Sequence, residues 1–88
     1  MGEALVRELG ALGHDVVGVD VLASETTTVT ASVSDRVAVR RAIAGIDAVI
    51  HAATLHKPHV ATHTKQMFVD ANVVGTLTLL EEAVRAKV

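Results

Sequence analysis

The apolar residues of the chain follow two spacings, one typical of amphipathic helices and one typical of buried strands. Residues 3–12 place three leucines on one helical face, and Gly13 is suited to end this helix in the left-handed conformation. Residues 16–20 form a short run of β-branched residues that stops at Asp20. Because this run is apolar on both faces, it predicts a strand that is covered on both sides in a parallel sheet.

The rest of the pattern predicts a second strand, a helix, a third strand and a long helix. Residues 29–33 alternate weakly, and Ser34 or Asp35 can cap the following helix, because a short side-chain oxygen accepts a backbone N–H there. Residues 47–51 are again apolar on both faces, and residues from about 65 to 87 form a long helical pattern. The predicted packed side of this last helix carries Val69, Val73, Leu77, Leu80 and Val84.

This order of elements, α-β-β-α-β-α, predicts an α/β fold class. We expect residues 1–88 to be one partial dinucleotide-binding domain, a doubly wound (Rossmann-like) parallel sheet with strands 2, 3 and 4 and flanking helices. An α/β chain should not begin on a helix with no strand to cover, so we expect the chain to be an interior fragment of a longer protein. Its strand at 47–51 should then either pair with the strand at 16–20, in the order 3-2-4, or leave an edge open for a second chain.

Composition excludes several classes of chemistry. The 88 residues contain no cysteine and no tyrosine, which excludes a disulfide framework, a thiolate site and a tyrosine acid or base within the chain. The net charge of −2 without basic clusters argues against nucleic acid as a partner. No apolar run approaches the roughly 20 residues of a membrane span, and no signal peptide is visible, so we expect no membrane partner and a cytoplasmic location.

The strongest local signal for function is Asp20 at the end of the predicted strand. An acidic residue at this place in a dinucleotide fold accepts hydrogen bonds from the adenosine ribose and repels a 2′-phosphate, which favours NAD over NADP. The alternative is that Asp20 only starts a turn. A glycine-rich phosphate loop is lacking, because Gly2 alone stands where the last glycine of such a motif would lie.

Three histidines, His56, His59 and His63, follow the third predicted strand and raise the question of a metal site. Three imidazoles are enough to bind zinc, but Pro58 interrupts the segment and no acidic residue stands nearby as a further ligand. We therefore predict no metal ligands and interpret the three as loop residues. His51, at the end of its strand, is interpreted as a core histidine with a hydrogen-bond partner.

Four segments carry a resemblance to a known family, and together they cover nearly the whole chain. They are residues 1–9, the Gly-His-Asp-Val-Val-Gly-Val-Asp segment at 13–20, residues 35–53, and residues 72–83, which open with Asn-Val-Val-Gly-Thr. In this order and spacing they resemble the extended short-chain dehydrogenases/reductases, the NAD-dependent epimerase/dehydratase family.

The resemblance implies a role for several residues in binding NAD. Asp20 would hold the adenosine ribose, and Gly2 would be the last glycine of the phosphate loop. Ser32 and Val33 would lie beside the adenine, where the family often has an acidic residue instead. The small groove residues would be Ala52, Ala53 and Thr54, and Asn72 would support the active-site architecture and the cofactor from the long helix.

The resemblance also implies a function and marks what this chain lacks. The parent protein would be an NAD-dependent epimerase, dehydratase or reductase acting on a nucleotide sugar or a related alcohol or ketone. The family's Tyr-x-x-x-Lys pair is absent here, so we assign no catalytic residue and expect weak NAD binding or none. Alternatives are a non-catalytic dinucleotide sensor of the same fold and a small metal-binding or interaction module built on the histidine loop. By analogy, the helix at 65–87 could pair two copies in a homodimer.

Overall fold

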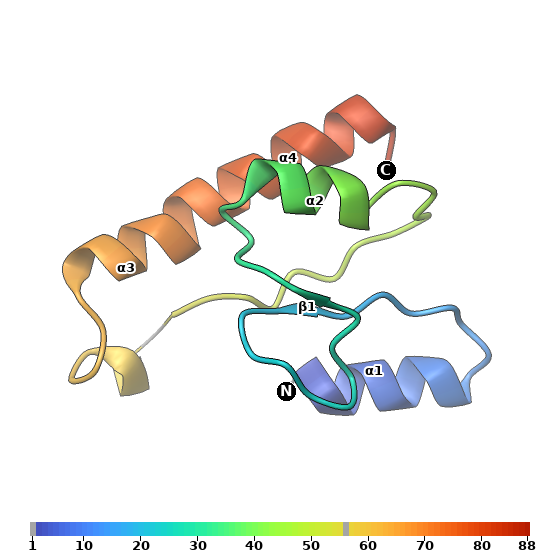
Figure 1. The fold of residues 1–88 in the computed structure, drawn as a ribbon, viewed down its shortest axis with the longest axis horizontal. Coiled ribbons are helices and arrows are strands. Elements are labelled where there is room, and N and C mark those ends of the chain that lie inside the picture. The colour runs from blue at the N-terminus through green and yellow to red at the C-terminus, as the bar shows by residue number, and fades with distance from the viewer. Residues whose placement is uncertain (1, 56) are drawn as a thin grey trace.

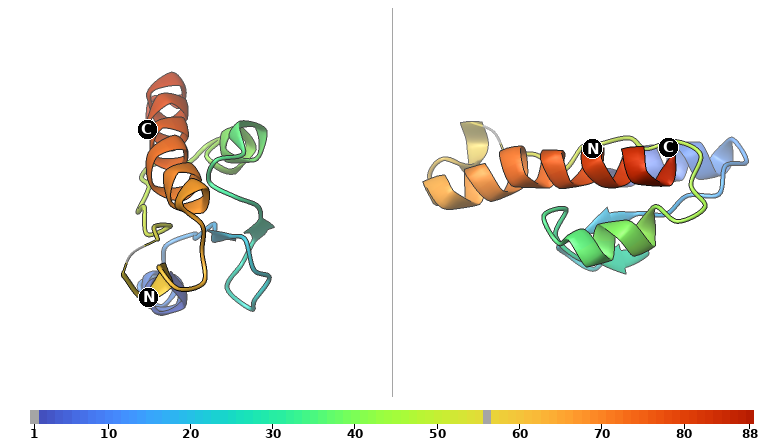
Figure 2. Two further views of the ribbon diagram at one scale, coloured as in Figure 1. Left: turned by 90° about the vertical axis from the view of Figure 1, so that its left-hand side faces the viewer. Right: turned by 90° about the horizontal axis from the view of Figure 1, so that it is seen from above.

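A computed structural model describes residues 2–55 and 57–88 and arranges them around a small parallel sheet. Helix α1 lies on one face of this sheet, while α2 and α4 lie on the other (Figures 1 and 2). The elements in chain order are α1 (Gly2–Ala11), β1 (Val19–Asp20), β2 (Val29–Thr30), α2 (Arg36–Ala42), η1 (Lys57–His59), α3 (Lys65–Val69), η2 (Asp70–Val74) and α4 (Gly75–Ala86). None of the described helices is both long and apolar enough to cross a membrane.

The helix ends follow the sequence signals closely. Gly13 ends α1 with a φ of 89°, and the amide of His14 donates to the carbonyl of Leu9 at 3.1 Å. This left-handed end satisfies carbonyls that the helix leaves open. Asp35 caps α2 by accepting a hydrogen bond from the backbone amide of Ala38 at 3.2 Å. The predicted cap and the predicted glycine end are both confirmed.

The sheet consists of β1 and β2, which pair in parallel with Val19 opposite Val29 and Asp20 opposite Thr30. The pairing extends slightly beyond these residues, because Gly18 and Asp20 also accept backbone hydrogen bonds from the following strand. Both strands are shorter than the apolar runs at 16–20 and 29–33. The predicted parallel arrangement of strands 2 and 3 is confirmed, but at reduced length.

The predicted third strand at 47–51 is wrong as a strand, although this segment is extended in the chain trace of Figure 1. A strand needs backbone hydrogen bonds to a neighbour, and within the described ranges the sheet contains β1 and β2 alone. Of the two alternatives for this segment, pairing with the strand at 16–20 in the order 3-2-4 is therefore also wrong. Ile50 remains 62% exposed, as expected for a segment without a strand on either side.

The long helix forms as predicted, but the prediction of its packed side is wrong. Helices α3 and α4 join through the π-helical turn η2 into one continuous rod (Figure 1). The five residues predicted to pack, Val69, Val73, Leu77, Leu80 and Val84, are between 44% and 78% exposed. The buried residues of α4 are instead Gly75, Thr78 and Glu82.

Contact with α2 decides which face of α4 is buried. The large apolar side chains buried in α2 and at its end are Val39, 3% exposed, and Ile43, 6% exposed. At the start of α4, Gly75 allows close approach of the segment that leads into α2, because a Cβ at this position would clash with Cγ1 of Val33. The interface therefore uses the small and polar face of α4, and the apolar stripe faces away.

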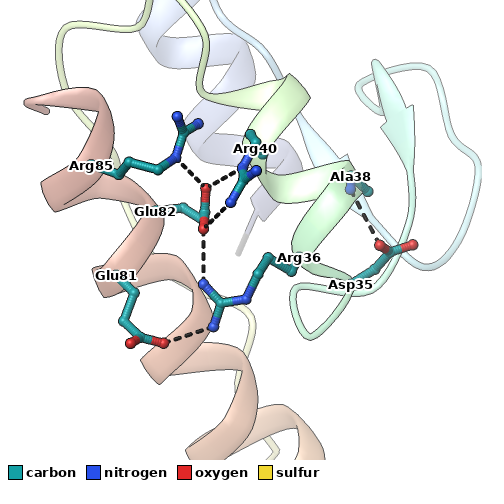
Figure 3. Close-up of polar contacts among 7 residues, drawn as sticks. All are labelled: Asp35, Arg36, Ala38, Arg40, Glu81, Glu82 and Arg85. Carbon is teal, nitrogen blue, oxygen red and sulfur yellow. Dashed lines mark hydrogen bonds and ion pairs between the residues drawn. The ribbon is translucent and has the colours of Figure 1, made fainter.

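A cluster of ion pairs holds α2 against α4 (Figure 3). The Glu82 side chain is 2% exposed, and it accepts hydrogen bonds from Arg40 at 2.7 Å, Arg36 at 2.8 Å and Arg85 at 2.9 Å. Arg36 also reaches Glu81 at 2.7 Å. A buried carboxylate without partners would be costly, and here three guanidinium groups compensate its charge.

These arginines hold the pKa of the Glu82 carboxyl far below its ordinary value of 4.5, chiefly through the hydrogen bond from Arg40 and then those from Arg85 and Arg36. A group with a lowered native pKa stabilises the fold above its unfolded pKa, and this contribution is lost as the pH falls toward the native value. We therefore expect the cluster to contribute fully at neutral pH and to weaken progressively below pH 4.5.

Replacing Glu82→Gln should lower the melting temperature at pH 7 by roughly 5–10 °C, because it removes the negative charge that the three arginines share. The half-exposed Glu81→Gln is the matched control and should change it by less than about 2 °C. Thermal melting followed by circular dichroism from pH 7 to pH 3 measures both effects. A melting temperature of Glu82→Gln that falls as steeply with acid as that of the wild type would contradict this prediction.

Candidate functional site

The carboxyl ends of three extended segments meet at one edge of the molecule. The strands β1 and β2 and the segment 47–51 run from right to left in Figure 1, while α1, α2 and α4 run back the other way. This places Asp20, residues 31–33 and residues 52–55 at the same edge. In open α/β sheets, ligands bind in the crevice outside the carboxyl ends of the strands.

Asp20 is exposed at the end of β1, and one of its two carboxylate oxygens accepts a hydrogen bond within the protein. Its Oδ1 accepts a hydrogen bond from the backbone amide of Leu22 at 3.2 Å, which starts the turn that follows the strand. None of the described residues donates to its Oδ2. The two readings of Asp20 as a turn former and as an acceptor for a ligand are therefore compatible in this geometry.

Ser32 and Val33 follow β2 and are half-buried next to the α2 cap. The hydroxyl of Ser32 lies 2.7 Å from that of Ser34 and accepts from the Ser34 amide at 3.2 Å, so it is engaged in the turn. The side chain of Val33 packs against Gly75 of α4. The predicted adenine-side position is thus fixed by the start of α2 and by the long helix.

Ala52, Ala53 and Thr54 are exposed after the segment 47–51, and Asn72 fixes the chain immediately beyond them. The Asn72 Oδ1 accepts from the amide of Leu55 at 2.7 Å, and its Nδ2 donates to the carbonyl of Leu55, also at 2.7 Å. This two-point clamp satisfies both backbone groups of one residue. Asn72 therefore ties the long helix to the loop at 52–55.

The clamp stands at the centre of the π-helical turn Asp70–Val74. In this turn the amide of Gly75 donates to the carbonyl of Asp70, five residues back, instead of following the α-helical pattern. Such turns occur mostly as single insertions in helices and often near functional sites. Here the turn coincides with the side chain that connects the long helix to the loop at 52–55.

The remaining predicted site residues lie apart from this framework. Gly2 is the first residue of α1, on the same side of the molecule as Asp20, and a Cβ there would meet nothing within 4 Å.

The rings of His59 and His63 are 5.2 Å apart, and His56 lies outside the described residues. Among the residues that the structure describes, no group of three or more potential metal ligands comes together. The Nε2 of His51 lies 3.0 Å from the hydroxyl of Thr76, so this histidine has a partner as expected.

The family model for the NAD dependent epimerase/dehydratase family matches residues 1–88, which is the whole chain. The chain belongs to this family. Neither the comparison with curated proteins nor the comparison with solved structures gave a match. Membership confirms the resemblance drawn from the four segments, and it implies a Rossmann-like α/β fold and use of NAD(P) by the intact protein.

For this epimerase/dehydratase chain, the assignment of individual site residues stays a prediction. Sequence reasoning named Asn72 but not its partner Leu55, since a backbone contact across 17 residues leaves no sequence signal. Sequence reasoning also missed Glu82, which in the pattern of apolar and polar positions looks like an ordinary surface charge of the last helix. An asparagine inside a helix is a usable signal, because its side chain competes with the helix backbone for hydrogen bonds and disfavours that position without a tertiary role.

Replacing Asn72→Ala should lower the free energy of unfolding by about 1–3 kcal/mol, because two hydrogen bonds to the Leu55 backbone are lost. Amide exchange at Leu55 should accelerate as well. Urea unfolding and amide hydrogen exchange measure the two effects. Gln66→Ala removes an exposed hydrogen bond to Asp70 one turn earlier and serves as the control. Equal unfolding midpoints for both variants would show that the clamp does not hold the loop.

Proposed function

We propose that this chain supplies the adenosine-side part of the NAD site in an epimerase/dehydratase-type oxidoreductase. The observation that carries the proposal is the position of the exposed Asp20 carboxylate at the carboxyl end of β1. It lies at the same edge as the small residues 52–54, which the Asn72 clamp holds in place. By the family's chemistry, the substrate would be a nucleotide sugar or a related alcohol or ketone.

The residues present fit the adenosine end of NAD better than its phosphates. The Oδ2 of Asp20 can accept from a ribose hydroxyl, and the exposed Ala52 and Ala53 let a ligand approach the backbone. The pyrophosphate of a dinucleotide is normally held by backbone amides of a glycine-rich turn and a helix N-terminus. In this chain Gly2 alone stands at that position, as the first residue of α1.

The roles in the reaction divide accordingly between the cofactor and the protein. NAD, when bound, supplies reversible hydride transfer, and the protein supplies position and electrostatics. Asp20 would orient the ribose and disfavour a 2′-phosphate, while Asn72 would keep the wall at 52–55 in place. The chain contains no tyrosine, so the tyrosine that serves as proton-transfer group in the resemblance is not among its residues.

We also propose that the apolar stripe of the long helix pairs two copies of the chain. Its members are Val69, Val73, Leu77, Leu80 and Val84, and nothing in the described part of the chain buries them. Their spacing of four, four, three and four residues keeps them along one helical face. An exposed apolar stripe of this length is typical of an interaction surface rather than of a solvated face.

The preference for NAD over NADP provides the first test of the proposed site. We expect the chain to bind NAD weakly, with a Kd of about 1 mM, because the phosphate loop is lacking. NADP should bind more weakly still, since its 2′-phosphate faces the Asp20 carboxylate. Asp20→Ser should reduce the difference between the two nucleotides severalfold. Titration followed by amide chemical shifts measures both affinities.

Asp15→Asn is the matched control for this test, because Asp15 lies exposed at the opposite end of the same segment. It should leave the ratio of the two affinities unchanged. A Kd for NAD in the low micromolar range, or a preference for NADP that Asp20→Ser does not affect, would refute the assignment.

Self-association provides the second test. The apparent mass should rise above the monomer value of 9.2 kDa as the protein concentration increases, and Leu77→Glu should return it to the monomer. Size-exclusion chromatography with light scattering measures the mass. Val37→Glu changes an exposed valine of α2, away from the stripe, and should have no effect. A wild-type chain that remains monomeric at every concentration would exclude the stripe as a pairing surface.

A further inference from the structure

We propose that the loop at 21–28 is a closed ring of hydrogen bonds whose purpose is to orient the Asp20 carboxylate, with Thr27 and Gly18 as positioning residues. The inference rests on the proposed function, because it explains how Asp20 would be presented to a ribose. It adds two residues that neither the family resemblance nor the site description assigns. The ring begins at Asp20 itself, whose Oδ1 accepts from the amide of Leu22.

Thr27 fixes Leu22, the residue whose amide holds Asp20. Its hydroxyl donates to the carbonyl of Leu22 at 2.9 Å, and its amide donates to the carbonyl of Ser24 at 3.2 Å. The Ser24 hydroxyl also lies 3.0 Å from the Thr27 hydroxyl. Leu22 is therefore held from both sides, by Asp20 at its amide and by Thr27 at its carbonyl.

Gly18 closes the ring where the loop returns to the sheet. The amide of Thr28 donates to the Gly18 carbonyl at 2.7 Å, and the Gly18 amide donates to the Thr28 hydroxyl at 3.2 Å. A Cβ at position 18 would clash with the carbonyl oxygen of Thr26. A residue with a side chain at position 18 would therefore push the returning loop away from β1.

The consequence for Asp20 is a fixed carboxylate. Because Oδ1 accepts from the Leu22 amide, the direction of Oδ2 is fixed as well. The Asp20 side chain then loses little further rotamer freedom when a ligand binds. Without the Thr27 hydroxyl, Leu22 keeps one of its two anchors, its backbone can move, and the carboxylate bound to its amide loses this orientation. The pairing of β1 with β2 does not depend on this hydroxyl, because it runs through backbone groups such as the amide of Ala31 and the carbonyl of Asp20.

The test compares Thr27→Ala with Thr27→Ser, which keeps the hydroxyl, in the full 88-residue chain. Thr26→Ala is the control, because the Thr26 hydroxyl contacts Ser24 and does not reach Leu22. The first measurement is hydrogen exchange at the Leu22 amide without any ligand. We expect exchange about fivefold faster in Thr27→Ala and unchanged in the other two variants, since one hydrogen bond of ordinary strength is lost.

The second measurement is the ratio of affinities for AMP and 2′-deoxyAMP, obtained by titration followed by amide chemical shifts. The wild type should prefer AMP, Asp20→Ala should abolish the preference, and Thr27→Ala should reduce it toward the Asp20→Ala value. Thr27→Ser should restore it. A purely structural role for Thr27 would weaken both ligands equally and leave the ratio unchanged.

The outcomes separate the two proposals. Unchanged exchange at Leu22 in Thr27→Ala overturns the positioning role, whatever the nucleotides do. A ribose preference that Asp20→Ala abolishes and Thr27→Ala retains overturns it as well. A wild-type chain with no preference between the nucleotides refutes the proposed function of Asp20. In that case the exchange at Leu22 still decides whether Thr27 orients the carboxylate.

Discussion

The buried carboxylate of Glu82 is the contact on which the arrangement of the helices depends. It is enclosed by guanidinium groups from both α2 and its own helix, so α2 has to approach α4 at this point. That approach sets the rotation of the long helix about its axis. It places Gly75 against Val33 on one side and turns the stripe through Leu77 outward on another.

In this small chain, the ion pairs around Glu82 do the work that a large apolar core does in larger domains. Two large apolar side chains, Val39 and Ile43, are buried among the described residues, and small chains bury a low fraction of their surface. A directional ion cluster fixes one helix orientation where apolar contacts alone would allow several. The cost is a dependence on the ionisation of Glu82, which a hydrophobic contact would not have.

The long helix connects this anchor with the candidate site. The buried face of α4 begins at Gly75, directly after the π-helical turn that carries Asn72. Asn72 clamps Leu55, which directly follows residues 52–54, while Gly75 packs against Val33 in the segment that follows β2. Two walls of the candidate site are therefore positioned from one stretch of helix. The third, at Asp20, depends on its own loop and on β1.

The sequence by itself determined the features that depend on local chemistry. The helix end at Gly13, the cap at Asp35, the order of the first four elements and the family follow from spacing and from residue types, because turns, caps and amphipathic periods are set within a few residues. The position of Asp20 at a strand end is also local. These features needed no knowledge of which elements meet in space.

The tertiary structure alone decided which surfaces pack and which segments become strands. Residues 47–51 have the pattern of a strand, but a strand exists only with a hydrogen-bonded neighbour, and neighbours are a property of the fold. The stripe through Leu77 has the pattern of a core face, yet the polar face with Glu82 is buried, because two of the three partners of its charge come from a helix more than 40 residues away. Periodicity identifies an apolar face, and only the packed structure determines whether anything covers it.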